Sequence, residues 1–181
     1  MHLSDLLARC RAHDVKAQRL LYERYAGRLF RVAQRYMKDR MEAEDMLVSA
    51  FQKIFEHLKK FEYKDEAATW VWMKTILVNQ CLMELRRSAN FTMVPENEAA
   101  EQTFTYSIIE EIAAETIQKL ITELPIGYRT IFNLVALEGY THMEVAKQLQ
   151  ISEGTSKSQL NKARQLLQKK LQALGYAAQT R

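Results

Sequence analysis

The stretch THMEVAKQLQISEGTSKSQLNKARQLLQKKL, residues 141–171, decides the fold of the C-terminal half of the chain. Thr141 and Glu144 have the spacing of a capping box, which predicts a short helix over residues 143–149. A tight turn follows, and Ser152 is a predicted N-cap of a longer helix. A short helix, a turn and a longer helix together predict a helix-turn-helix unit.

The longer helix has two different faces at about 100° per residue. The apolar face holds Leu160, Ala163, Leu167, Leu171 and Leu174; the opposite face holds Ser158, Asn161, Lys162, Gln165 and Lys169, and Lys157 lies at its edge. From Lys157 to Lys170 the chain carries five basic residues and no acidic one. A solvated surface helix would also tolerate such a face, but its place after the turn predicts contact with DNA bases and phosphates.

Outward from this stretch toward the N-terminus, two further helices are expected over residues 109–124 and 125–137. Pro125 suits the first turn of the second of these helices, and Gly139 lies in the segment that breaks it. Residues 89–108 contain a proline, no basic residue and little periodicity, so they are expected to be an acidic, flexible linker.

The N-terminal 88 residues repeat apolar side chains at three- and four-residue steps. One predicted helical stripe holds Leu20, Leu21, Tyr25, Leu29, Val32, Ala33 and Tyr36. Asp39 and Glu42 have capping-box spacing before a second stripe of Met46, Leu47, Ala50, Phe51, Ile54, Phe55 and Leu58. A polar connection over residues 59–68 precedes a third predicted helix over residues 69–87.

Charge is unevenly distributed along a chain whose net charge is +4. Residues 1–88 carry 17 Lys and Arg against 12 Asp and Glu, and residues 89–110 carry none against 4. Residues 111–181 carry 9 against 6. Two basic segments around an acidic one fit a nucleic-acid partner and fit solvated helix faces equally well.

Other function classes find little support in the sequence. The four histidines lack metal-ligand spacing, no glycine-rich phosphate loop is present, and no nucleophile lies beside a base, so we expect no metal, no cofactor and no enzymatic activity. Cys10 and Cys81 are expected to be buried, reduced thiols. No signal peptide or membrane-spanning run is apparent, which predicts a cytoplasmic protein.

Two long stretches resemble a known family. Residues 124–171, LPIGYRTIFNLVALEGYTHMEVAKQLQISEGTSKSQLNKARQLLQKKL, resemble the fourth conserved region of extracytoplasmic-function (ECF) sigma factors of the sigma-70 family. Residues 21–61, LYERYAGRLFRVAQRYMKDRMEAEDMLVSAFQKIFEHLKKF, with residues 69–87, TWVWMKTILVNQCLMELRR, resemble the second region. Both regions occur in the family's order and spacing.

The resemblance implies an all-α fold of two small helical domains joined by a flexible linker. Residues 1–88 would be the region 2 domain, residues 89–108 the linker and residues 109–181 the region 4 helix-turn-helix domain. Such a protein binds core RNA polymerase, directs it to specific promoters and assists DNA melting at initiation. Many family members are also held inactive by an anti-sigma factor, often one bound to the membrane.

Residue roles follow from the same resemblance. Asp45 matches an acidic residue that docks on the polymerase, and the matching positions beside it are Val48, Ser49 and Gln52. The family usually has Gln-Glu or Gln-Asp where this chain has Val48-Ser49. Positions that match minus-ten recognition and melting are Phe61, Tyr63, Lys64, Trp70, Asn79, Arg86 and Arg87. Positions that match minus-thirty-five recognition are Lys157, Ser158, Asn161, Lys162 and Arg164.

Three alternatives remain open at this point. Trp70 either meets DNA or belongs to the core, and Trp72 is expected to be a core residue. Gln150 takes the place of a frequent glycine in the turn, which costs about 1 kcal/mol if the backbone there needs a positive φ. A repressor or response regulator with a helix-turn-helix would explain the C-terminal half alone, but it would leave residues 45–87 without a role.

Overall fold

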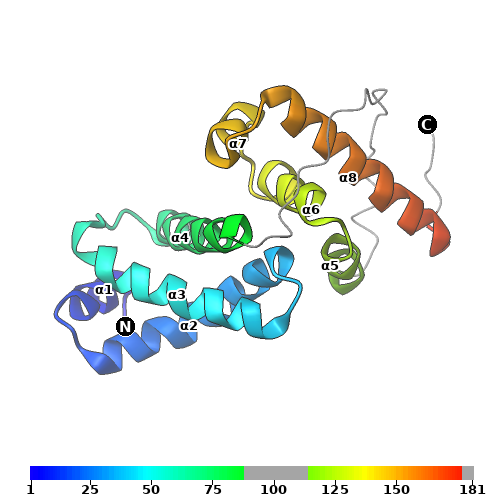
Figure 1. The fold of residues 1–181 in the computed structure, drawn as a ribbon. Coiled ribbons are helices and arrows are strands. Elements are labelled where there is room, and N and C mark those ends of the chain that lie inside the picture. The colour runs from blue at the N-terminus through cyan, green and yellow to red at the C-terminus, as the bar shows by residue number, and fades with distance from the viewer. Residues whose placement is uncertain (88–113, 177–181) are drawn as a thin grey trace. The chain divides into compact units, whose positions relative to one another are not determined.

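A computed structural model of the chain describes residues 1–87 and 114–176, and these residues contain helices and no strand. The chain divides into two compact units, Met1–Ser88 and Ala89–Arg181. Figure 1 shows the helices of each unit packed around one another. The predicted all-α class with two small helical domains is confirmed. The predicted linker over residues 89–108 lies outside the described residues.

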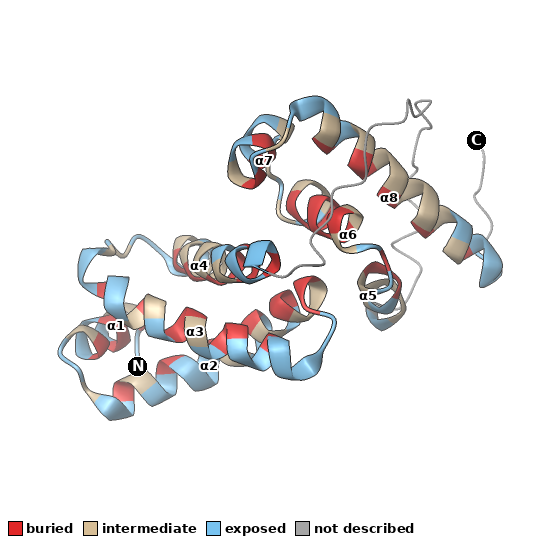
Figure 2. Ribbon diagram, in the orientation of Figure 1, coloured by how far each residue is buried: buried red, intermediate tan, exposed pale blue. Residues whose placement is uncertain are grey.

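The first unit contains α1 (Leu3–Arg11), α2 (Val15–Tyr36), α3 (Arg40–His57), the short 3₁₀ helix η1 (Leu58–Lys60) and α4 (Glu66–Arg87). Helices α2, α3 and α4 contact one another pairwise, and α1 packs on α2 and η1. In Figure 2 the buried residues of this unit lie where the helices face each other. A single core therefore fixes α3 and α4, the two helices that carry the predicted docking and melting residues.

Polar caps decide where the helices of the first unit begin. The Asp14 carboxylate accepts hydrogen bonds from the amides of Lys16 and Ala17, and the Asp39 carboxylate accepts one from Met41. Asp65 accepts a bond of 2.6 Å from the Ala68 amide, so α4 begins at Glu66, three residues before the start predicted from periodicity.

The predicted apolar stripes form the core with one exception in α2. Leu21, Tyr25, Leu29, Val32, Ala33 and Tyr36 are buried, as are all stripe residues of α3 and η1 except the half-buried Phe55. Leu20 was expected on the stripe but is 45% exposed. At about 100° per residue, Leu20 lies on the side of Leu21 away from the other stripe residues, so it falls outside the buried face.

The second unit contains α5 (Ala114–Thr122), α6 (Ile126–Phe132), a π-helical turn η3 (Asn133–Leu137), α7 (His142–Leu149) and α8 (Glu153–Ala173). Helix α8 packs against α5, α6 and α7. Pro125 is the N-cap of α6 and lies one residue before the predicted first turn. Gly139, at φ 80°, separates η3 from α7 as predicted.

The apolar side of α8 is buried over four of the five predicted positions, Leu160, Ala163, Leu167 and Leu171. The fifth, Leu174, is the C-cap residue and is 55% exposed. The helix ends at Ala173, so Leu174 no longer continues the stripe toward the core.

Candidate nucleic-acid interface

Helices α7 and α8 form the predicted helix-turn-helix, and side-chain caps fix both of its helix starts. Thr141 and Glu144 form a reciprocal capping box at the start of α7. The Ser152 hydroxyl accepts a bond of 2.8 Å from the Thr155 amide at the start of α8. Between them, Gln150 takes the left-handed conformation at φ 57° and ψ 46°. The positive φ on which the cost of Gln150 depends is therefore present.

A hydrogen bond joins the two helices across the turn. The His142 Nδ1 and Ser156 Oγ atoms lie 2.8 Å apart, and Ser156 is fully buried. Burial lowers the pKa of His142, and the positive charges of Lys157 and Arg164 lower it further, although Glu153 raises it. The lowered pKa favours the neutral form of the ring, and its bond to Ser156 connects α7 to α8.

The reading face predicted on α8 is the side turned away from the buried stripe. Lys157 is exposed, while Ser158, Asn161 and Lys162 are half-buried. The Ser158 hydroxyl donates to the Thr155 carbonyl, and Lys157 lies 3.8 Å from Glu153. Glu153 lies in the first turn of α8, and the rest of this face offers cations, an amide and a hydroxyl, groups suited to phosphates and base edges.

Two basic residues of α8 lie outside this face. Lys170 forms an ion pair of 2.6 Å with Glu123 at the end of α5, so it connects two helices of the unit. Arg164 is half-buried and close enough to His142 to lower the pKa of that ring. Of the five basic residues between Lys157 and Lys170, these two are therefore placed among protein groups.

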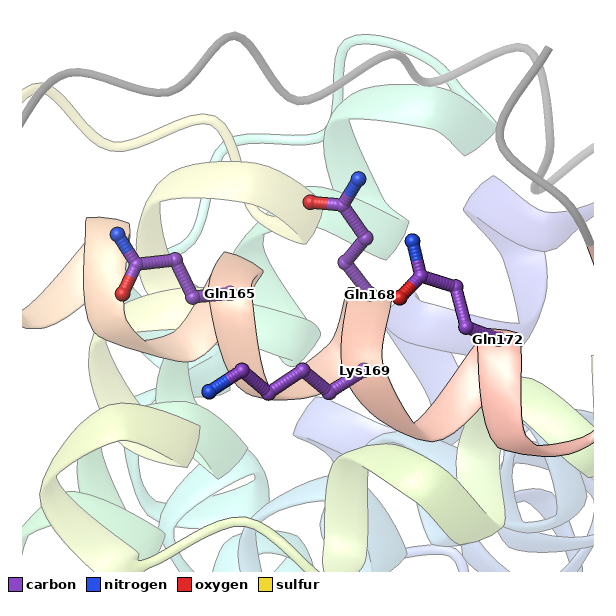
Figure 3. Close-up of a pocket in the computed structure, with 4 residues that line it drawn as sticks. All are labelled: Gln165, Gln168, Lys169 and Gln172. Carbon is purple, nitrogen blue, oxygen red and sulfur yellow. The ribbon is translucent and has the colours of Figure 1, made fainter.

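Further along α8, three glutamines and a lysine line a pocket. Figure 3 shows Gln165, Gln168, Lys169 and Gln172 side by side on successive turns of the helix. Gln165 and Lys169 belong to the polar face predicted from the sequence. The amide groups and the ammonium group extend the polar surface of α8 toward its C-terminal end.

In the first unit, the connection from Phe61 to Asp65 begins beside an aromatic stack. The Phe61 and Trp72 rings lie 4.1 Å apart with an interplanar angle of 19°. Trp72 is half-buried, so its expected place in the core is wrong: one face of its ring packs on Phe61 at the surface. Tyr63 is half-buried and Lys64 is exposed in the same connection.

Trp70 has a partner that the sequence did not suggest. The Arg28 guanidinium lies 4.1 Å from the centre of the Trp70 ring, in cation–π geometry. Arg24, one turn earlier on α2, pairs with Glu66 at the start of α4 at 2.9 Å. Trp70 is half-buried. The spacing of Arg24 and Arg28 shows that they share a helix face, but nothing in the sequence indicates which helix they meet.

Asn79, Arg86 and Arg87 are exposed along α4, as expected for side chains that meet DNA. Arg86 also donates to the Leu82 carbonyl at 3.3 Å. Val71 and Met83 are exposed on the same helix, 54% and 42% respectively. The outer surface of α4 thus combines apolar, amide and cationic groups.

The predicted docking residues gather on the outer side of α3. Asp45, Val48 and Gln52 are exposed, and Ser49 is half-buried. Met41, which was not predicted, is 73% exposed one turn before Asp45. Its spacing from Asp45 and Val48 was the available signal, because positions four and seven residues apart share a helix face. The result is a mixed acidic and apolar stripe that faces solvent.

The two thiols are buried as predicted, and burial raises the pKa of Cys10 to about 11 and that of Cys81 to about 12. Within residues 1–87 and 114–176, no three His, Cys, Asp or Glu side chains come together as a metal site would require. In the same part of the chain, no helix is long and apolar enough to cross a membrane.

Family models match both units. The model described as Sigma-70 region 2 matches residues 21–91, and the model described as Sigma-70, region 4 matches residues 110–167. Over 173 residues the chain is 30% identical to the ECF RNA polymerase sigma factor SigM of Mycobacterium tuberculosis, with 96% of this chain and 85% of SigM covered. The chain belongs to the ECF sigma factors of the sigma-70 family.

Two further relatives agree with this assignment. The sigma factor is 27% identical to the RNA polymerase sigma-H factor of Pseudomonas aeruginosa, with 94% of each chain covered. Its fold is similar to that of the sigma factor RpoE of Bartonella quintana, solved with the anti-sigma factor NepR, at a TM-score of 0.51 and 19% identity. That comparison covers 87% of this chain and 98% of RpoE.

Family membership identifies this chain as a sigma factor that directs RNA polymerase to promoters, and so as a transcription regulator. The similarity to SigM spans both units, which rejects the alternative of a stand-alone helix-turn-helix repressor. A repressor of that kind would account for α7 and α8 alone.

Proposed function

We propose that the two units divide promoter recognition between them. The domain of residues 1–88 docks on core polymerase through α3 and captures an unstacked minus-ten base at α4 and the connection before it. The domain of residues 109–181 reads the minus-thirty-five element with α8, and residues 89–108 join the two. The chain supplies binding and positioning, and it acts in the cytoplasm without catalytic chemistry of its own.

The observation that carries the melting assignment is the pair of half-buried tryptophans on α4. Phe61 stacks on Trp72, and Arg28 lies over Trp70, so partners already hold both indole rings in place. Base–aromatic stacking contributes about 1–3 kcal/mol per base, which offsets the few kcal/mol that unstacking a base costs. Exposed Asn79 supplies an amide that distinguishes base edges, and Arg86 and Arg87 suit the phosphate backbone.

The polar outer face of α8 supports the assignment of this helix to the upstream, minus-thirty-five element. We assign direct base contact to Ser158 and Asn161 and phosphate contact to Lys157 and Lys162. Arg164, beside His142, is nearer the protein side of the helix and is assigned to the phosphates at the edge of the groove. The capping box and the Ser152 cap hold α7 and α8 in fixed register for this task.

The exposed stripe of α3 supports the docking assignment. Asp45 would meet a basic surface of the polymerase. Val48, where the family usually has a polar residue, would add apolar contact together with Met41. Ser49 and Gln52 flank this contact. An anti-sigma factor is a further proposed partner, as in the solved RpoE complex, and copurification from a native extract tests for it and for core polymerase together.

The experiment compares Asn79→Ala with wild type in open-complex formation, read by permanganate reactivity of unpaired thymines. We expect a defect on duplex promoters that shrinks on templates mismatched across the minus-ten region, because unpairing is then already done. The defect should also depend on which base occupies the captured position. Gln80→Ala, about 100° further round α4, is the matched control. Equal Asn79→Ala defects on both templates, for every base, would reject base capture by this amide.

A further inference from the structure

Arg11, the last residue of α1, reaches across the first unit to the start of the connection that precedes α4. Its Nε donates to the Leu58 carbonyl at 3.1 Å and its Nη2 donates to the Phe61 carbonyl at 2.5 Å. Both bonds are partly buried, and they join residues 47 and 50 positions apart in the chain. One planar guanidinium therefore connects α1 to both ends of the turn that places Phe61.

The element that carries Arg11 is itself firmly held. Leu3, Leu6, Leu7 and Cys10 are all buried on one side of α1. The helix contacts α2 and η1. It also lies outside residues 21–91, the part of the chain that matches the region 2 model. Arg11 is thus fixed at its base by core packing and directed at a turn that also contacts α3.

The two carbonyls that Arg11 binds flank η1: Leu58 is its first residue and Phe61 is its C-cap. The Leu58 carbonyl also accepts the Phe61 amide at 3.2 Å, so one oxygen closes the turn and receives the guanidinium. The Phe61 carbonyl lies just past the last residue of η1, where carbonyls lack helical partners and a positive charge is favoured. The backbone at Phe61 in turn sets where its ring stacks on Trp72.

We propose that Arg11 is a positioning residue for base capture, one that holds the backbone of Phe61 so that the Phe61–Trp72 stack and the following connection are formed before DNA arrives. The inference rests on the melting function proposed above. A side chain that orders the site before DNA binds lowers the entropy cost of binding the captured base. Replacing Arg11 should therefore weaken the contribution of that base to binding and leave the rest of the DNA contact unchanged. Lysine is a poor substitute, because its single ammonium lacks the fork that reaches two carbonyls.

The test measures binding of core polymerase, reconstituted with each variant, to a nontemplate-strand oligonucleotide. The oligonucleotide spans the minus-ten region of a promoter on which the wild-type holoenzyme initiates, and versions with one abasic site at each position in turn identify the captured base. Wild type should bind the intact strand about tenfold more tightly than the version abasic at that base. Arg11→Gln should lose most of this discrimination, and Arg11→Lys should retain an intermediate part of it.

Arg9→Gln is the matched control. Arg9 lies on the same helix and pairs with Asp14 at 2.6 Å, so its replacement changes the net charge equally without touching the connection. It should weaken binding to both strands alike and leave the ratio unchanged. Circular dichroism and a melting curve establish that each variant is folded. If Arg11→Gln does not fold, the charge-retaining Arg11→Lys decides.

The outcomes separate the two claims. If folded Arg11→Gln prefers the intact strand over the abasic strand as strongly as wild type does, the positioning role is overturned and base capture is unaffected. The same result in Arg11→Lys has this meaning if only that variant folds. A wild-type holoenzyme that binds intact and abasic strands equally at every position overturns base capture itself, and with it any role of Arg11 toward DNA. Loss of discrimination in Arg11→Gln alone, with Arg9→Gln unaffected, supports the proposal.

Discussion

Gln150 holds the turn between α7 and α8 in the left-handed region, at φ 57°. A side chain with a Cβ pays about 1 kcal/mol there, and glycine avoids that cost. Gln150→Gly should therefore stabilise the second unit by up to about 1 kcal/mol, seen as a higher melting temperature. Lys147→Gly, within α7, is the control and should lower stability by about 1 kcal/mol. A destabilised Gln150→Gly variant would contradict the geometry of this turn.

His142 makes the stability of the second unit depend on pH. Folding lowers the pKa of the ring below its ordinary value of 6.5, so the unfolded chain takes up the proton first as the pH falls. The contribution of neutral His142 to the free energy of unfolding is therefore complete above the ordinary pKa of 6.5. It is lost as the pH falls through the lower pKa of the folded state.

Thermal melting of the whole chain between pH 7.5 and about 5 measures this dependence. His142→Asn, which does not titrate, should flatten the curve in this range. Glu144 also has a lowered pKa, because the Thr141 amide and hydroxyl donate hydrogen bonds to its carboxylate. The stability that this carboxylate contributes is lost only below pH 4.5, outside the range of the measurement. An unchanged pH profile in His142→Asn would show that the ring is not kept neutral by the fold.

At the scale of the element, α8 carries lysines of two kinds. Lys162 lies on the proposed DNA face, and Lys170 pairs with Glu123 of the same unit. Lys162→Ala should weaken binding of the holoenzyme to all promoter sequences alike. It should also lower by about 1 the salt slope, which is the steepness with which the logarithm of the binding constant falls with the logarithm of salt concentration. Lys170→Ala should leave that slope unchanged and lower stability by about 1 kcal/mol or less, because surface ion pairs contribute little.

Asn161 differs from both lysines, since an amide reads base edges. Asn161→Ala should cost about 1–3 kcal/mol at one base pair of the upstream element and relax specificity there. Binding measured across a library of upstream elements, each changed at one position, reports this effect. A uniform loss across the whole library would assign Asn161 to the backbone instead.

Helices follow from local signals, which explains why the sequence predicted most elements. Periodic leucines gave the core faces of α2 and α8, and Thr141 with Ser152 gave the starts of the helix-turn-helix. Errors arose where a helix boundary decides burial: Leu174 follows the last helical residue and is exposed. The start of α4 was missed because Asp65, its cap, lies in a polar segment with no apolar period.

Contacts between distant residues were beyond the sequence. The bonds from Arg11 to residues 58 and 61, and that of Arg28 to Trp70, depend on how α1, α2 and α4 pack. No periodicity within one helix encodes them. Phe61, Tyr63 and Trp70 were found from the family resemblance, but Trp72 was expected in the core, and its stacking on Phe61 required the three-dimensional structure.

At the scale of the whole molecule, Asp45 is expected to control assembly with polymerase. Asp45→Arg should weaken binding to core polymerase by at least about tenfold while the helical content stays unchanged, because the carboxylate is exposed and its loss costs little stability. Glu44→Arg is the control: it is adjacent on α3, pairs with Arg40 at the surface and points about 100° away. Equal loss in both variants would indicate a general charge effect and reject the docking assignment.

The central claim is that this chain gives RNA polymerase its promoter specificity and has little of its own. In vitro transcription of genomic DNA from the source organism, with the 5′ ends of the transcripts mapped, tests it most directly. Core polymerase with the chain should start at a discrete set of sites that share two spaced elements, and core alone should not. The chain alone should bind those sites weakly at physiological salt, since a single reading helix makes few contacts. Tight, site-specific binding by the isolated chain, with no new start sites in the presence of core polymerase, would contradict the account.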